Sequence, residues 1–147
     1  MSSLDDFSCE NVPVDEPVKS NKIPFTVINT NARSLSPKIN SLIDCFSQME
    51  ASIGVITETW LTDGEALDEE IDDLTSGTGL GMVYRNREVN GRGFSHGGVA
   101  IVYREAAMSL RKMKIHNPKR FEVVAAECNL KGMRRKLVVV GLSLIHI

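Results

Sequence analysis

The feature that most constrains this chain is a strand, helix and strand pattern within residues 25–61. An apolar run at 25–28 predicts a buried central strand, and a second run at 53–57 predicts another. Between them, a Ser-Pro pair is typical of a helix start, and apolar residues then recur along one face of a helix over 37–50. A helix that joins two such strands predicts a parallel βαβ unit.

A polar residue follows each of the two predicted strands. Asn31 comes shortly after the first strand, and Glu58 comes directly after the second. In an open α/β sheet, ligands and metals bind in the crevice beyond the carboxyl ends of neighbouring strands. The pattern therefore predicts that Asn31 and Glu58 are neighbours in one site.

Beyond residue 80 the pattern changes to strands. The last two predicted strands form an antiparallel hairpin with Gly132 at its turn. A βαβ unit followed by a mostly antiparallel meander is typical of an α+β or layered α/β domain. The predicted strands cover residues 81–85, 97–103, 108–115, 121–130 and 135–142.

The net charge of −2 hides a separation of the two signs along the chain. Residues 1–73 carry 15 acids and 4 bases, whereas residues 74–147 carry 4 acids and 13 bases, so the second half could face a polyanion. Residues 1–22 combine prolines, serines and acids, which predicts a disordered leader. No apolar run is long enough to span a bilayer and no signal peptide is recognisable, so we expect an intracellular protein without a membrane partner.

Three segments carry a resemblance to a known family: Asn-Ala-Arg-Ser-Leu at 31–35, Ile-Thr-Glu-Thr-Trp-Leu at 56–61 and Gly-Gly-Val-Ala-Ile at 97–101. Over residues 23–141 the chain resembles the endonuclease/exonuclease/phosphatase superfamily. Within it, the chain looks most like the apurinic-type endonuclease domain of non-LTR (LINE-like) retrotransposons. The resemblance implies an α/β fold, the N-terminal half of a four-layered α/β/β/α sandwich that is incomplete here.

The resemblance also implies a function and a set of site residues. It implies hydrolysis of DNA phosphodiester bonds with Mg²⁺ (or Mn²⁺), Glu58 as the metal-binding glutamate and Asn31 as the active-site asparagine beside it. Magnesium takes one or two carboxylates and keeps several waters, so one Glu at a strand end suits it. Arg33, Arg92 and His96 are candidates for contact with nucleic acid.

Parts of the family's machinery are missing from this sequence. The D-x-N and S-D-H motifs that the family uses in its second half do not occur. We therefore expect a fragment, inactive by itself, with residues 142–147 as a non-native tail. The parent protein would act on DNA in the nucleus, with a reverse transcriptase domain in the same chain.

Two other functions stay open. One is a non-catalytic nucleic-acid-binding module that uses the basic strands at 85–136, in which Glu58 has no role. The other is a phosphatase of the same fold, because the fold hosts several phosphoester chemistries.

Overall fold

The computed structural model describes residues 25–61, 69, 71–72, 75–86, 96–116 and 119–144. These residues form two sheets, with strand orders β1-β2-β4-β3 and β5-β6-β7. The expected leader at 1–22 lies outside the described residues. Within the described part, no helix is long and apolar enough to cross a membrane. The elements are β1 (Val27–Asn31), the 3₁₀ turn η2 (Ser36–Lys38), α1 (Ile39–Gln48), β2 (Ile53–Thr57), β3 (Leu80–Arg85), β4 (Val99–Arg104), β5 (Met108–Lys112), β6 (Phe121–Leu130) and β7 (Lys136–Leu144).

The predicted βαβ unit is confirmed, but its first strand differs from the expectation. β1 and β2 pair in parallel, with Asn31 opposite Thr57. β1 is an edge strand of the first sheet rather than a central one, and the side chain of Val27 is 54% exposed. Because one side of an edge strand faces solvent, the strand can include polar residues and runs on to Asn31.

The helix packs its apolar face on the first sheet. Its buried side chains, Leu42 and Phe46 among them, share a core with Ile56 of β2 and Val102 of β4. A Cβ on Gly54 would lie 2.9 Å from the ring of Phe46, so the helix approaches β2 closely at this glycine. The helix begins two residues later than predicted because the Ser-Pro pair forms a 3₁₀ turn instead.

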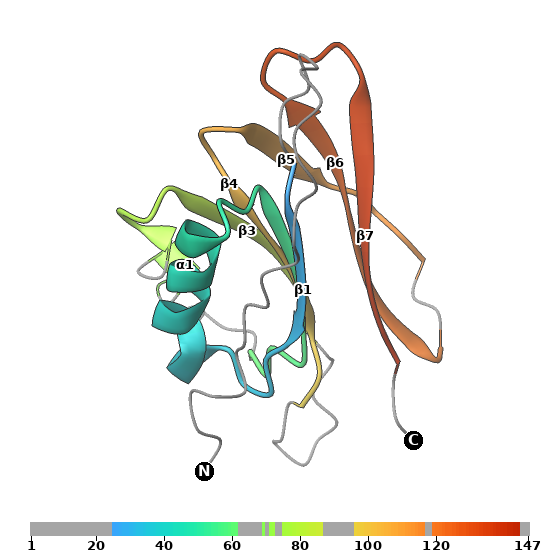
Figure 1. Ribbon diagram of the computed structural model, residues 1–147. Helices are drawn as coiled ribbons and strands as arrows, with labels where there is room; N and C mark the ends of the chain where they lie inside the picture. Colours follow the sequence, from blue (N-terminus) through green and yellow to red (C-terminus); the bar gives the residue numbers. More distant parts are fainter. Residues whose placement is uncertain are drawn as a thin grey trace, which may run out of the picture.

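The other face of the first sheet packs on the second sheet, which gives three layers in the order α, β, β (Figure 1). Ile53 and Ile101 meet Val124 and other residues of the second sheet in this core. A Cβ on Gly141 of β7 would lie 2.8 Å from Cγ1 of Val99, so the sheets come close together there. This arrangement confirms the expected layered α/β fold, although β4 lies between β2 and β3, so the first sheet is not a simple meander.

The predicted hairpin is also confirmed, with β6 and β7 antiparallel and Gly132 in the turn between them at φ +82°. One face of β7 is apolar and more than half exposed. β7 continues to Leu144, past the predicted end of the domain at 141. That residues 142–147 form a non-native tail stays a prediction. The side chains on the exposed apolar face of β7 are those of Val138, Val140, Leu142 and Leu144.

Candidate functional site

Asn31 and Glu58 line one groove at the carboxyl ends of β1 and β2. The groove has a volume of about 560 Å³, and residues 142–144 at the end of β7 supply its other wall. Parallel pairing of β1 with β2 places Asn31 directly opposite Thr57, one residue before Glu58. The structure thus brings together the two residues that the sequence analysis predicted to be neighbours.

The backbone conformation of Glu58 interrupts the alternation of side chains along β2. Along β2, Val55 faces the second sheet and Ile56 faces the helix. Simple alternation would put Thr57 on the groove side with Asn31 and would turn Glu58 toward the helix. Glu58 instead has φ +55°, a left-handed conformation that ends the alternation, and Glu58 is among the residues that line the groove.

The two loops that follow β1 and β2 continue the pairing of the strands. The amide of Ser34 donates to the carbonyl of Glu58 (2.9 Å), and the amide of Leu35 donates to the carbonyl of Thr59 (2.9 Å). Left-handed backbone at residues other than glycine is sparsely populated, and it concentrates at functional sites. Four of the five such residues in the described part of the chain lie in these loops: Arg33, Ser34, Glu58 and Trp60.

Trp60 orients the carboxylate of Glu58. Its indole Nε1 donates a hydrogen bond to Oε2 of Glu58 at 2.8 Å. The ring of His96 lies against the indole, with ring centroids 4.4 Å apart and planes tilted by 32°. His96 was predicted only as a candidate nucleic-acid contact, and in the structure its ring lies against Trp60, the residue that donates to Glu58.

Asn31 forms part of the turn that it begins. Its Oδ1 accepts a hydrogen bond from the backbone amide of Arg33 at 3.2 Å. An amide oxygen has two lone pairs, so Oδ1 can accept this bond and still ligate a cation. Arg33 is exposed and follows Asn31 by two residues, whereas Arg92 lies outside the described residues.

A buried lysine supports the same turn. Lys38 is 4% exposed, and its Nζ donates to the carbonyl of Ala32, the residue after Asn31. A buried ammonium is costly unless it is hydrogen-bonded. Lys38 therefore holds the first loop against the start of the helix.

The sequence analysis missed a buried carboxylate that supports the second loop. Trp60 N donates to Gly97 O (2.8 Å) and Thr59 N donates to Gly98 O (3.4 Å). The amide of Gly98 in turn donates to Oε2 of Glu122 on β6 at 2.7 Å, and Glu122 is 5% exposed. One signal could have identified Glu122, namely a lone acid in the otherwise apolar first half of β6.

The donor set fits a hard divalent cation that keeps most of its water. No group of three or more His, Cys, Asp and Glu side chains that could hold a metal ion occurs among the described residues. Glu58 and Asn31 offer a carboxylate and an amide oxygen in one open groove. Within the described part of the chain, no residue donates a hydrogen bond to Oε1 of Glu58. One or two oxygen ligands plus water are what magnesium commonly takes from a protein.

A basic groove of about 590 Å³ lies at the same end of the sandwich. Arg85, Lys112 and Lys114 line this groove. Arg85 of β3 and Thr57 of β2 lie opposite the same residue of β4, Val99, so both grooves are at this end of the first sheet. Nη1 of Arg85 donates to the carbonyl of Val123 (3.3 Å), which ties the first sheet to the second.

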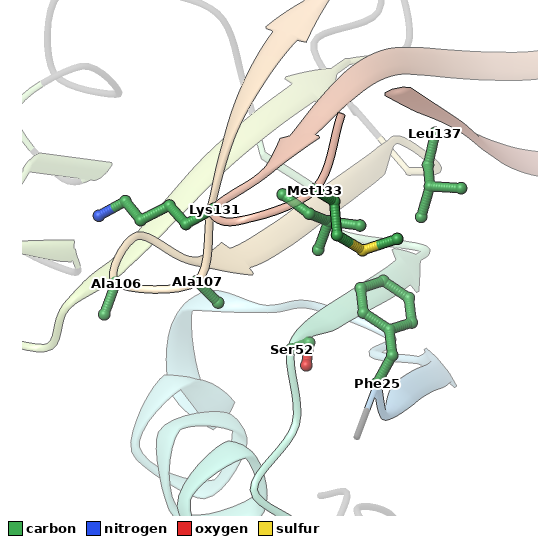
Figure 2. A pocket seen from close by; sticks show the side chains of 8 residues that line it. Phe25, Ser52, Ala106, Ala107, Lys131, Met133 and Leu137 are labelled. Atoms are coloured by element: carbon green, nitrogen blue, oxygen red, sulfur yellow. The ribbon is translucent and has the colours of Figure 1, made fainter. Parts of the chain in front are cut away.

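A third cavity, of about 370 Å³, lies near the amino-terminal end of β2 (Figure 2). Phe25, Met133 and Leu137 point into it, with Ser52 and Lys131 as its polar neighbours. This cavity lacks carboxylate and amide ligands among its lining residues, so it does not suit a hard metal.

Comparison with known proteins supports the fold. The chain resembles the human Nocturnin catalytic domain, in a structure with a bound sulfate anion, with a TM-score of 0.58 and 10% sequence identity. The chain thus shares the fold of part of that catalytic domain, a helix packed on two sheets. The match covers 81% of this chain and 49% of the Nocturnin chain, so this chain spans about half the length of that structure. The sequence matches no protein-family model and no curated protein.

Proposed function

We propose that this chain is the N-terminal part of a metal-dependent endonuclease that hydrolyses DNA phosphodiester bonds, as in target-site nicking by a non-LTR retrotransposon. One observation supports this most strongly. Glu58 and Asn31, a carboxylate and an amide, line one open groove at the carboxyl ends of two parallel strands. The likeness to the fold of Nocturnin's catalytic domain is compatible with hydrolysis of a phosphoester, but it does not identify the substrate.

In this proposal Glu58 and Asn31 hold one Mg²⁺ or Mn²⁺ ion. Such an ion, when bound, neutralises charge that develops on the phosphoryl oxygens. The indole of Trp60 fixes the rotamer of Glu58 so that the other carboxylate oxygen can face the cation and its phosphate. We assign contacts with the nucleic acid strand to Arg33 and His96. Arg92 stays a candidate of the same kind.

The chain does not contain a full set of groups for hydrolysis. In-line attack on phosphorus also needs a base for the water, and the D-x-N and S-D-H motifs that would provide it do not occur in the sequence. We therefore expect the 147-residue chain to bind metal and DNA but not to nick plasmid DNA.

Metal-dependent DNA binding tests the proposal. A metal that bridges Glu58 and a phosphate predicts that Mg²⁺ tightens binding to a fluorescently labelled duplex, relative to EDTA, at constant ionic strength. We expect Glu58→Gln to abolish this gain, because a neutral amide is a much weaker ligand for magnesium. The measurement is fluorescence anisotropy. Glu105→Gln is the matched control, since Glu105 is an exposed acid at the other end of β4.

The same experiment separates the two nucleic-acid functions. A non-catalytic binding module at 85–136 predicts affinity that falls steeply with salt and is unchanged by EDTA or by Glu58→Gln. The basic groove with Arg85, Lys112 and Lys114 is the surface that would carry it. A gain with Mg²⁺ that persists in Glu58→Gln would reject Glu58 as the metal ligand. Mg²⁺-dependent binding of inorganic phosphate without any binding of DNA would favour the phosphatase.

A further inference from the structure

We infer that Glu122 is a positioning residue for the metal site, which it supports from the second sheet through the backbone of Gly98. The inference rests on the proposed function in one respect only, that Glu58 is a metal ligand. Glu122 does not line the groove that contains Glu58. Its effect would pass through the loop between β3 and β4.

The contacts form a continuous chain from Glu122 to Glu58. Oε2 of Glu122 accepts the amide of Gly98 at 2.7 Å. The carbonyls of Gly97 and Gly98 accept the amides of Trp60 and Thr59. The indole of Trp60 then donates to Glu58 at 2.8 Å. Each step is a hydrogen bond, and the last one acts on the proposed ligand itself.

The hydrogen-bonded residues are shielded from water, and their backbone conformations are the ones that these contacts require. Glu122 is 5% exposed and Thr59 is 1% exposed, so water has little access to either side chain. Gly97 and Gly98 have φ +93° and +90°, a conformation that presents the Gly98 amide to β6 and its carbonyl to the Glu58 loop. Glu58 and Trp60 are themselves left-handed, at φ +55° and +54°. A strained loop keeps such a conformation only where its surroundings enforce it.

The role assigned to Glu122 is to accept a hydrogen bond, and it does not require a charge. A matched pair of variants isolates this property. Glu122→Gln keeps an acceptor oxygen at the same position, whereas Glu122→Met has a similar length and no such oxygen. Both variants remove the buried charge, so a difference between them reports the acceptor.

Trp60 gives a direct readout of the site, since it is the single tryptophan of the chain. The experiment titrates Mn²⁺ into wild type and both variants and follows quenching of Trp60 fluorescence. It also measures acrylamide quenching of the metal-free proteins, deuterium exchange of the Gly98 amide, and thermal unfolding by far-UV circular dichroism.

We expect Glu122→Met to bind Mn²⁺ about tenfold more weakly than Glu122→Gln, the effect typical of groups that orient a metal ligand. Acrylamide should reach Trp60 more readily in Glu122→Met alone, and its Gly98 amide should exchange faster. The melting temperatures of the two variants should agree within about 5 °C, since both fill the same space.

Three results would overturn the inference. The two variants could both keep the Mn²⁺ affinity and the Trp60 quenching of wild type. Both could lose affinity equally, which would assign the effect to the charge. Glu122→Met could fail to fold while Glu122→Gln folds, which would make the acceptor a requirement of the whole fold rather than of the site.

The proposed function fails in a different way. If Glu58→Gln binds Mn²⁺ as wild type does, Glu58 is not the ligand. The quenching of Trp60 and the exchange of Gly98 in the metal-free variants then still decide whether Glu122 positions the loop.

Discussion

The glycine at position 98 offers the sharpest test of how this site is built. A Cβ on Gly98 would lie 2.3 Å from Oγ1 of Thr59, closer than real Cβ contacts allow. Thr59 cannot easily yield, because it is 1% exposed and its neighbours on both sides are in left-handed conformations. We therefore expect Gly98→Ala to displace the loop that carries Glu58 and to destabilise the fold.

The magnitude follows from two separate costs. A left-handed backbone costs alanine about 1–2 kcal/mol, and the smaller entropy of the unfolded alanine chain returns about 0.4–1 kcal/mol. Forcing a methyl group into a packed site adds about 1–3 kcal/mol. The free energy of unfolding should thus fall by about 2–4 kcal/mol, a large share of the roughly 5–15 kcal/mol of a typical domain.

Gly132→Ala is the matched control. Gly132 has φ +82°, and a Cβ there would meet no atom within 4 Å, so this variant bears the backbone cost alone. We expect it to lose only about 1 kcal/mol. Urea unfolding followed by far-UV circular dichroism gives both values, and the difference between the variants measures the contact with Thr59.

A double-mutant cycle identifies the atom responsible. Thr59→Ala removes Oγ1, so Gly98→Ala should cost about 1–2 kcal/mol less in that background than in wild type. The reasoning is refuted if Gly98→Ala costs no more than Gly132→Ala, or if Thr59→Ala brings no relief.

Two further predictions concern the hydrogen-bonded carboxylates of Glu58 and Glu127. Trp60→Phe removes the donor to Glu58, so Mn²⁺ should bind about tenfold more weakly, measured by electron paramagnetic resonance of free Mn²⁺; unchanged affinity would show that the indole does not orient Glu58. Hydrogen bonding from Lys136, with the charge of Arg111 nearby, lowers the pKa of Glu127 from its usual 4.5. Because the folded pKa lies below the unfolded one, the ionised Glu127 stabilises the fold above about pH 4.5 and loses this effect as the pH falls further. The difference in unfolding free energy between wild type and Glu127→Gln should therefore shrink from about pH 7 to about pH 3, and a constant difference would contradict the assignment.

Strands with both faces buried were the easiest elements to predict from the sequence. The limits predicted for β2 and β6, 53–57 and 121–130, are those of the structure. Both strands lie between neighbours, so nearly continuous apolar runs mark them. β1 was misplaced by two to three residues because it lies at an edge, where Asn29 and Asn31 interrupt the apolar pattern without interrupting the pairing.

Only part of the candidate site could be predicted in the same way. The position of Asn31 and Glu58 at neighbouring strand ends follows from local pattern and from the geometry of a parallel pair. The hydrogen bond from Trp60 to Glu58 spans only two residues, but both have left-handed backbone, which no local pattern marks. The support from Glu122 depends on β4 lying between β2 and β3 and on β6 packing beneath it. Such contacts join residues far apart in the chain, and no local spacing encodes them.

The register of β1 against β2 and the turn at Glu58 are both needed to assemble the candidate site. A slip of one residue would move Asn31 from the groove side of the sheet to the helix side, because side chains alternate with a period of two. The packing of Ile28 and Ile56 against the helix opposes such a slip, since it would turn these apolar side chains away from the core. The left-handed conformation at Glu58 then ends the alternation, and Glu58 lines the same groove as Asn31. Hydrophobic burial therefore fixes one proposed ligand, and a strained backbone supported from the second sheet fixes the other, so variants in the core and variants around Gly98 should displace different ligands.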